Sequence, residues 1–409
     1  MEPVLERCCG IDVGEATITA CLLVGAPDEK LRKTIRTVGT VTRELEKLRG
    51  WLISEGCTHV AMEATGIYWV PIFVALEGHF DITVANAHHI KAVPGRKTDV
   101  KDAEWIADLL RHGLLKKSFV PPKEIRQLRD LTRYRRKLIE ARTAERNRLL
   151  KLLEGANIKL AGVASDVFGV SGMLILRELI TGEATPEEMA ELAKGRLRNK
   201  RRELELALEG RLEEHHRFLL GLQIRRLEQM ESDVVVIEAR IREKLRPFRA
   251  QVELLLSIPG ISDLVAAAVI AEVGIDMSVF GTAVRLSGWA GVCPANHESA
   301  GKRKKVRVRK GNIYLKTILV EAANGAAATR GTYFKDKLFR LQARRGRNRA
   351  LMAIAHKLLT TIFHVLAHGV PYKELGAGYL DGLKPVRTAQ TLVRRLERMG
   401  YKVHIESAA

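Results

Sequence analysis

The surplus of positive charge is the feature that most limits what this chain can be. Its 409 residues contain 68 Lys and Arg against 48 Asp and Glu, which gives a formal net charge of +20. A folded protein with such a surplus normally lies beside a polyanion, and nucleic acid is the commonest one. Apolar residues make up 46% of the chain. That is enough for a sizeable core shared by two or three domains, and too much for a disordered protein.

Two other classes of protein are disfavoured. No run approaches ~18 uncharged apolar residues, and the first residues lack a signal-peptide pattern, so we expect neither a membrane span nor secretion. The five cysteines form no Cys-x-x-Cys pair, and four lie in apolar, strand-like stretches. We therefore expect reduced core thiols and no structural zinc. The histidine pairs at 88–89 and 215–216 are given no metal role.

Residues 1–120 are expected to form one mixed-sheet α/β domain, because short strands alternate with helices there. The strand patterns cover 8–14, 17–24, 32–38, 59–62 and 80–85, and the helical patterns cover 42–55, 68–77 and about 98–111. The pair Pro121-Pro122 ends this unit.

The remainder is expected to be helical in three parts: a basic coiled-coil linker (121–250), a helical domain (251–375) and a basic helical tail (376–409). In the linker, long helices are predicted at 123–153 and 196–246, separated by a Gly-containing connector. Met230, Val234, Ile237 and Ile241 recur there at spacings of four, three and four, as a coiled-coil seam requires. A solvated helical bundle with charged faces is the alternative.

Four carboxylates of the first domain are predicted to meet. Asp12 lies within an apolar strand and Glu63 ends the fourth strand, while Asp99 and Asp102 lie on one face of a helix start. If the first and fourth strands are neighbours, all four acids surround one point. Hard cations take oxygen ligands, so this arrangement predicts one or two Mg²⁺ ions for phosphoryl chemistry.

Two other interpretations of these acids are open. Asp99 and Asp102 are also typical of a helix cap and first turn. Asp12-x-Gly14 also resembles the first phosphate loop of actin-like sugar kinases, although we find no second phosphate loop and no adenosine motif, and a kinase leaves the charge unexplained.

The second half offers contacts to phosphates. Ser257 to Glu272 has the form of a helix-hairpin-helix, in which the turn at Pro259-Gly260 presents backbone N–H groups to a phosphate; a packed Ala-rich helix pair is the alternative. Ser299 precedes Gly301 and a run with seven basic residues in nine. A serine attacking a phosphodiester needs such positive charge nearby, although a loop serine usually has no such role. We predict nucleic-acid contacts at Lys302, Arg303, Lys304, Lys305, Arg307, Arg309, Lys310, and at Arg129, Arg133 and Arg136 of the linker.

Linked motifs in collinear order carry a resemblance. The first half contains Gly10-Ile-Asp-Val-Gly14, Ala61-Met-Glu-Ala-Thr-Gly-Ile-Tyr68 and Lys97-Thr-Asp-Val-Lys-Asp102. The second half contains Gly288-Trp-Ala-Gly-Val-Cys-Pro294, Glu298-Ser-Ala-Gly-Lys302 and Arg309-Lys-Gly-Asn-Ile-Tyr-Leu-Lys316. Over about 8–120 and 250–370 the chain resembles the DEDD transposases of insertion sequence family 110, whose relatives include the Piv-type DNA invertases. It departs from them at Ala300, where the family commonly has glycine.

The resemblance implies an RNase H-like domain of the RuvC type, a coiled-coil linker and a helical domain with a catalytic serine. It implies an RNA-guided recombinase that exchanges donor and target DNA strands in a homotetramer, with a noncoding bridge RNA as guide. Asp12, Glu63, Asp99 and Asp102 become the acids that bind Mg²⁺, and Ser299 the nucleophile that joins covalently to DNA. Such a protein works in the prokaryotic cytoplasm, beside the nucleoid.

Two other functions compete with this one. A metal-dependent junction nuclease of the Holliday type would cut DNA with activated water at the carboxylates, without Ser299. A nucleic-acid-binding structural protein would need none of these residues for chemistry. Only the recombinase leaves protein covalently attached to DNA.

Overall fold

The computed structural model divides into two compact units, Met1–Val120 and Pro121–Ala409. It describes residues 4–26, 30–87, 90, 102–293, 310–383 and 385–406, and the backbone of 298–299 and 302–303. Asp99, His297, Lys304, Lys305, Arg307 and Arg309, like the pair at 88–89, lie outside the described residues. Each unit is described by itself.

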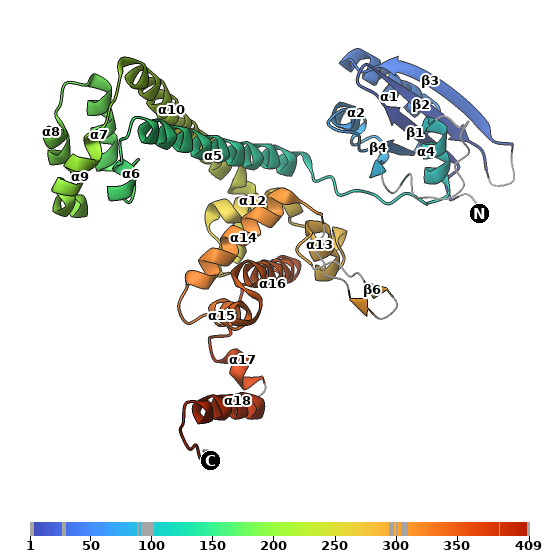
Figure 1. Cartoon of the computed structure of the whole chain (residues 1–409). Helices are drawn as coiled ribbons and strands as arrows, with labels where there is room; N and C mark the ends of the chain where they lie inside the picture. The colour runs from blue at the N-terminus through green and yellow to red at the C-terminus, as the bar shows by residue number, and fades with distance from the viewer. Residues whose placement is uncertain are drawn as a thin grey trace. The chain divides into compact units, whose positions relative to one another are not determined.

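The first unit is built on a five-stranded mixed sheet with the strand order β3-β2-β1-β4-β5 (Figure 1). β1 pairs antiparallel with β2 and parallel with β4, β2 pairs antiparallel with β3, and β4 pairs parallel with β5. The strands are β1 (Arg7–Val13), β2 (Thr17–Val24), β3 (Arg32–Gly39), β4 (His59–Glu63) and β5 (Asp81–Ala85). This sheet, followed by a largely helical second unit, fits the predicted RNase H-like α/β domain with an all-α part.

Alternation along β1 sends its side chains to two different cores. Cys9, Ile11 and Val13 join the core under α1 (Thr42–Ser54) and α2 (Trp69–Leu76). On the opposite face, Cys8 packs with α4 (Asp102–Arg111). The strand cysteines are buried free thiols, as predicted. Burial raises the pKa of the Cys8 thiol to about 12, which keeps that thiol protonated.

The second unit begins with a long helical hairpin of α5 (Lys123–Gly155) and α10 (Glu214–Leu245). The α10 seam buries Leu227, Val234, Ile237 and Ile241 at the spacing of seven, three and four that knobs-into-holes packing uses. Arg146 and Glu231 are paired across the hairpin at 2.7 Å. Three members of the predicted seam are therefore buried within one chain, whereas Met230 is only half-buried and Leu227 takes the next position of the seam.

The predicted continuous helix at 196–246 is wrong. Chain 196–208 forms a 3-10 turn at Gly195–Lys200 and α9 (Arg201–Leu208), and α10 begins only at Glu214. Gly210 is the physical reason, because a Cβ there would lie 2.6 Å from the carbonyl oxygen of Ala156. The backbone N–H of Arg211 donates to that same oxygen at 2.8 Å. Close packing on the end of α5 thus separates the two helices.

The segment between α5 and α10 is a folded helical module and not a simple connector. Leu153, Leu176, Leu204 and Leu220 belong to one buried core there. Its helices are α6 (Leu160–Val163), α7 (Val170–Thr181), α8 (Pro186–Glu191) and α9. Helix α8 has a capping box at its start, in which Thr185 accepts from the Glu188 N–H and Glu188 accepts from the Thr185 N–H.

The rest of the second unit is a helical domain around α16 (Arg347–His368), which packs against α14 (Ile313–Ala328) and α15 (Tyr333–Arg345). By length and hydropathy α16 alone, in the described part of the chain, is able to cross a membrane. Half of its apolar window is buried in this domain, so we interpret it as a core helix. The other helices are α11 (Arg249–Leu256), α12 (Asp263–Val273), α13 (Ala283–Ala290) and α17 (Tyr379–Gly382).

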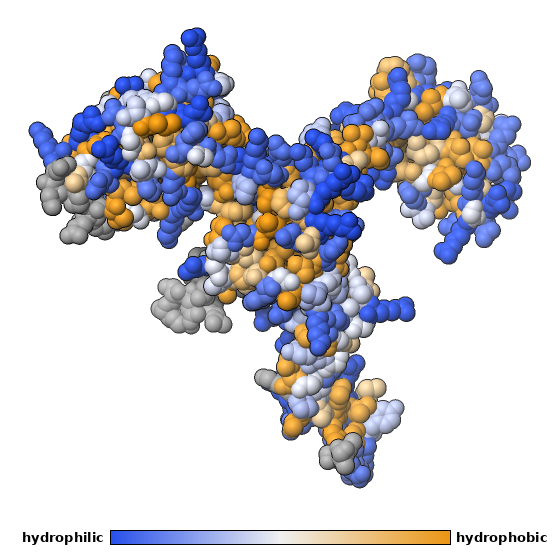
Figure 2. All heavy atoms as spheres, turned by 180° about the vertical axis from the view of Figure 1, so that it is seen from behind, coloured by the Kyte–Doolittle hydropathy of each residue, from blue (hydrophilic) through white to orange (hydrophobic). Residues whose placement is uncertain are grey.

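The predicted basic tail contains α18 (Pro385–Arg398), which buries none of its residues. Val386, Leu392 and Leu396 are exposed on it beside Arg387 and Arg394. Figure 2 shows the resulting mixture of apolar and hydrophilic side chains at the C-terminal end.

Candidate active site

Asp12 and Glu63 lie at the carboxyl ends of two neighbouring parallel strands, Asp12 one residue before the end of β1 and Glu63 at the end of β4. The register of β1 and β4 pairs Gly10 with Ala61 and Ile11 with Met62. Asp12 and Glu63 come directly after the last of these pairs, and both are half-buried. Because the carboxyl ends of parallel strands meet at the same edge of a sheet, the predicted proximity of these two acids is realised.

Helix α4 brings a third acid to this edge. A Cβ at Gly10 would lie only 2.2 Å from the Ala107 nitrogen and 2.4 Å from the Ala103 oxygen, so only glycine lets the helix lie this close to β1. The Cys8 thiol donates to the Ala107 carbonyl oxygen at 3.6 Å. Asp102, the first residue of α4, thereby reaches the end of β1 where Asp12 lies.

The electrostatics of Asp12 follow from this packing. Its pKa is raised above the ordinary 3.8, first by burial and then by the negative charges of Asp102 and Glu63. In the described part of the chain no Lys or Arg forms an ion pair with Asp12 or Glu63, and the Glu63 carboxylate accepts from the Thr65 hydroxyl at 3.3 Å. A divalent cation fits this set, since it prefers carboxylate oxygens and would compensate their repulsion.

Ser299 lies in a loop whose two ends meet. Helix α13 ends at Gly291 in the left-handed conformation, with φ 69°. A Cβ at Gly311 would lie 2.5 Å from the Gly291 nitrogen, so the chain closes on itself before α14 begins. Within the loop, β6 (Glu298–Ser299) pairs antiparallel with β7 (Lys302–Arg303), and Ser299 is in register with Lys302. Lys310 is exposed at the end of the loop.

A buried carboxylate anchors the far end of this loop. Glu272 is 2% exposed and accepts two hydrogen bonds from Arg133, at 2.7 and 2.8 Å. The Asn312 side chain donates to it at 2.5 Å. Asn312 also caps α14 by accepting from the N–H groups of Tyr314 and Leu315. Sequence reasoning missed this role, although an acid in the apolar run of α12 was the available signal.

The three linker arginines form contacts within the second unit, and the nucleic-acid contact predicted for them stays a prediction. Arg129 donates to the carbonyl oxygens of Ala271 and Glu272 at the C-terminal end of α12, where the helix dipole favours a cation. Burial lowers the pKa of Arg129 to about 10. Arg133 binds Glu272, and Arg136 donates to Glu140 and to the Ile313 carbonyl oxygen. These side chains hold α5 on the helical domain.

The Pro259-Gly260 turn also has a packing role. Gly260 has φ +84°, and a Cβ there would lie 2.3 Å from the Ala322 oxygen and 2.4 Å from the Ala326 nitrogen. The turn thus lies directly on α14, and the N-terminus of α12 is capped by Ser262, which accepts from the Val265 N–H at 3.5 Å. Close helix packing accounts for Gly260 without a phosphate.

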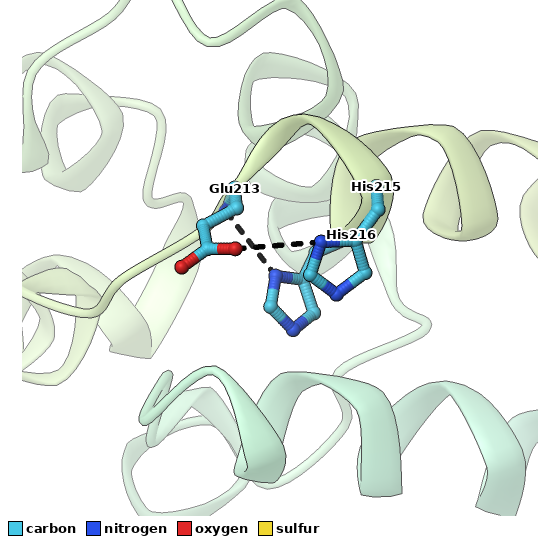
Figure 3. Close-up of side chains that lie close together, drawn as sticks. All are labelled: Glu213, His215 and His216. Carbon is cyan, nitrogen blue, oxygen red and sulfur yellow. Dashed lines mark hydrogen bonds and ion pairs between the residues drawn. The ribbon is translucent and has the colours of Figure 1, made fainter.

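One further group of possible metal ligands lies at the start of α10 (Figure 3). Glu213, His215 and His216 each offer an atom within 4.8 Å of the others. His216 Nδ1 accepts from the Glu213 backbone N–H at 3.2 Å, and His215 Nδ1 lies 3.5 Å from the Glu213 carboxylate. A helix N-terminus disfavours a cation, so we interpret the group as a helix cap.

Two family models match the chain. One, described as "Transposase" and of the DEDD IS110 type, matches residues 9–158. The other, described as "Transposase IS116/IS110/IS902 family", matches residues 252–338. The chain belongs to the IS110 family of transposases. The first matched range contains Asp12, Glu63 and Asp102. The second contains Glu272 and Ser299.

Curated relatives of the same kind cover most of the chain. The "Probable family 20 transposase" of Pseudomonas aeruginosa is 28% identical over 77% of this chain and 85% of its own length. The "Transposase for insertion sequence element IS1111A" of Coxiella burnetii is 25% identical over 78% of this chain and 79% of its own length. As an IS110-family transposase, the protein is an enzyme of a mobile element that acts on DNA.

Proposed function

We propose that this transposase is an Mg²⁺-dependent DNA recombinase that uses Ser299 as its nucleophile and an RNA as its guide. The observation that carries the proposal is the convergence of Asp12, Glu63 and Asp102, three carboxylates from three elements, of which Asp102 and Glu63 raise the pKa of Asp12 by their negative charge. Such an arrangement costs folding energy. Its presence in a transposase is explained by a metal-dependent reaction on a phosphodiester.

The acids bind and orient the metal ions. Asp12 and Glu63 are held by neighbouring strands and Asp102 by α4, and Asp99 is assigned to the same set on the family resemblance. When bound, Mg²⁺ neutralises charge that builds up on the phosphate oxygens. The carboxylates fix its position, and the buried neighbours on β1 and α4 keep these side chains from moving apart.

Ser299 forms the covalent link. Its Oγ bonds to the DNA phosphorus as one bond between phosphorus and a sugar oxygen breaks. The hydroxyl proton of Ser299 ends on the released sugar oxygen. Because one phosphoester replaces another, the step needs no ATP, and a second DNA end reverses it to complete strand exchange. Lys302, in register with Ser299, and the basic run up to Lys310 supply positive charge for the phosphate.

Partners follow from the same proposal. A net charge of +20 suits a protein that holds donor DNA, target DNA and a noncoding bridge RNA together. Base pairing of that RNA with DNA would select the sites, while the protein contacts the backbones. The acids and the serine come from different protomers of a homotetramer. This assembly works in the prokaryotic cytoplasm, beside the nucleoid.

The second candidate is a metal-dependent junction nuclease that cuts with activated water at the same carboxylates. The described geometry of Asp12, Glu63 and Asp102 favours it as strongly as it favours the recombinase, since both need the metal. The two differ only in Ser299.

A covalent-trapping assay separates the two candidates. The full chain is incubated with Mg²⁺, RNA from the flanking sequence and labelled donor DNA, then denatured, and DNA that stays on the protein is measured. The recombinase predicts an adduct that is lost in Ser299→Ala and kept in Ser278→Ala, a control at an exposed serine of the same unit. Free cleaved DNA without an adduct supports the nuclease and overturns the serine mechanism.

A further inference from the structure

A cavity of about 410 Å³ lies in the second unit between α5, α10, α12 and α14. This volume falls in the range of about 300–1,000 Å³ that small-molecule sites occupy. Its apolar lining consists of Ile139, Ile241, Leu264, Ala268 and Ile318. The rest of the lining includes arginines of α5 and Tyr314 of α14. A lining that combines apolar side chains with cations suits a ligand with an apolar body and a negative charge.

Three of the arginines that line the cavity are held in place by contacts within the protein. Arg133 is bound to Glu272, and its guanidinium lies 4.4 Å from the centre of the Tyr314 ring. Arg135 pairs with Glu238 of α10 at 2.7 Å. Arg136 donates to the Ile313 carbonyl oxygen at 3.2 Å and lies 5.1 Å from the Tyr314 ring. The cavity is therefore formed before any ligand enters it.

Arg142 differs from the other arginines of the cavity because its Nε has no hydrogen-bond partner among the described residues. It is half-buried and lines the cavity, and this nitrogen is itself buried. Glu140 is paired with Arg136 and Lys137, and Glu272 with Arg133, so neither neutralises Arg142. A buried N–H of a cationic side chain without an acceptor is satisfied by an anion from outside the chain.

Glu321 completes the polar lining. It lies on α14 at the same cavity, is exposed, and forms no ion pair with Arg142 among the described residues. A carboxylate at this position accepts hydrogen bonds from a ligand. The cavity thus offers a guanidinium donor and a carboxylate acceptor, and an apolar surface between the helices. A nucleotide matches all three, because it has a phosphate, ring N–H groups and a flat, weakly polar base.

We propose that this cavity binds one nucleotide of a single-stranded nucleic acid, with the phosphate on Arg142 and the base against Ile139, Leu264 and Ile318. The inference rests on the proposed function insofar as the protein handles unpaired strands. Removing a base from its stack costs free energy, and it costs least where the strand is already unpaired. The site would hold a strand near the loop of Ser299, because Tyr314 follows the Asn312 anchor of that loop.

The test uses the full chain and a single-stranded DNA oligonucleotide that carries one 5-iododeoxyuridine, a base that cross-links to nearby aromatic side chains on irradiation. The cross-linked peptide is identified by mass spectrometry. We expect it to contain Tyr314. In Arg142→Gln the oligonucleotide should bind about tenfold more weakly, as expected for loss of one charged hydrogen bond, and the Tyr314 cross-link should disappear. Arg225→Gln, at an exposed α10 arginine outside the cavity lining, should keep both.

Competition distinguishes the possible sources of the nucleotide. If free deoxyuridine monophosphate suppresses the cross-link, the cavity accepts a nucleotide from either source; if only unlabelled oligonucleotide does, neighbouring backbone contacts are needed as well. Inorganic phosphate at the same concentration should suppress it little, because it has no base. Equal suppression by phosphate, equal losses in both variants, or a cross-link elsewhere would each overturn the proposal.

Failure here and failure of the proposed function are separable. Ser299→Ala should keep the Tyr314 cross-link, since Ser299 is not needed for binding. A covalent DNA adduct that survives in Arg142→Gln, together with no cross-link in the wild-type chain, would reject the cavity and leave the recombinase intact.

Discussion

The two units treat buried negative charge in opposite ways. In the first unit, Asp12 meets Glu63 and Asp102, and the mutual repulsion contributes to the raised pKa of Asp12. In the second, Glu272 is more deeply buried but is surrounded by donors from Arg133 and Asn312. A compensated carboxylate is a structural element. A group of carboxylates that repel one another is maintained at a cost, and is explained by a cation that function supplies.

Neutralising one acid of the cluster of Asp12, Glu63 and Asp102 tests its role most directly. Asp12→Asn should lower the rate of DNA cleavage or strand exchange by at least about 10³-fold, because metal stabilisation of the reacting phosphate is worth several kcal/mol. The measurement is cleavage of donor DNA in the presence of Mg²⁺. Asp108→Asn, further along α4, is the control and should retain activity. Full activity in Asp12→Asn would remove the acids from the mechanism.

Neutralising the compensated carboxylate should instead damage the fold. Glu272→Gln leaves Arg129 and Arg133 partly buried without their counter-charge, and should lower the free energy of unfolding by about 3 kcal/mol, in the range for breaking buried ion pairs. Urea unfolding followed by circular dichroism measures this. Glu140→Gln removes an exposed partner of Arg136 and Lys137 and should cost less than about 1 kcal/mol. Equal costs in the two variants would contradict the anchoring role of Glu272.

The approach of α4 to β1 is the packing condition for the acid cluster. Gly10→Ala places a methyl group against the backbone of Ala103 and Ala107 and should lower stability by about 1–3 kcal/mol, as overpacking does. Because the helix must move, Asp102 moves away from Asp12 and cleavage should fall as well. Gly50→Ala, at a helical position of α1 with nothing within 4 Å, is the matched control. A stable Gly10→Ala protein with normal cleavage would show that α4 does not position Asp102.

Local patterns were sufficient to predict the proximity of Asp12, Glu63 and Asp102, but not the anchor of the serine loop. The alternation in β1 and β4 and their position in the strand order place Asp12 beside Glu63, because neighbouring parallel strands end at one edge. Glu272 lies 139 residues from Arg133, and nothing in an apolar helical run shows what a single acid contacts. For the same reason, a stretch rich in arginine predicts a cationic helix that faces solvent. In the structure Arg129 and Arg133 donate hydrogen bonds to α12 instead.

Glycines were the second limit on prediction. Gly10, Gly210 and Gly260 each lie where a Cβ would touch the backbone of another element, and the sequence does not show which element approaches. The helical module between α5 and α10 was missed for a related reason. Its short helices lack a long apolar period of their own, and they become stable by sharing one core with the ends of the two long helices.

Repulsion among the acids also predicts a small effect on the stability of the metal-free protein. Without metal, Asp12→Asn should stabilise the first unit at pH 7, the opposite of Glu272→Gln, by less than about 1 kcal/mol because solvent screens half-exposed charges. The pKa of Asp12 is raised above 3.8 in the folded chain. Between pH 3.8 and this raised pKa, the folded state holds a proton that the unfolded state has released. The stability of the wild-type chain therefore falls as pH rises through that window, relative to the variant.

Urea unfolding in EDTA at several pH values measures this difference, with Asp108→Asn as the control. The gap between wild type and Asp12→Asn should widen from about pH 4 upward and become constant above the raised pKa. Adding Mg²⁺ should then stabilise the wild-type chain and not the variant, since ligand binding to the folded state alone shifts unfolding by mass action. If the wild type is the more stable protein at pH 7 in EDTA, the three carboxylates do not repel one another, and the inference of a metal from their repulsion fails.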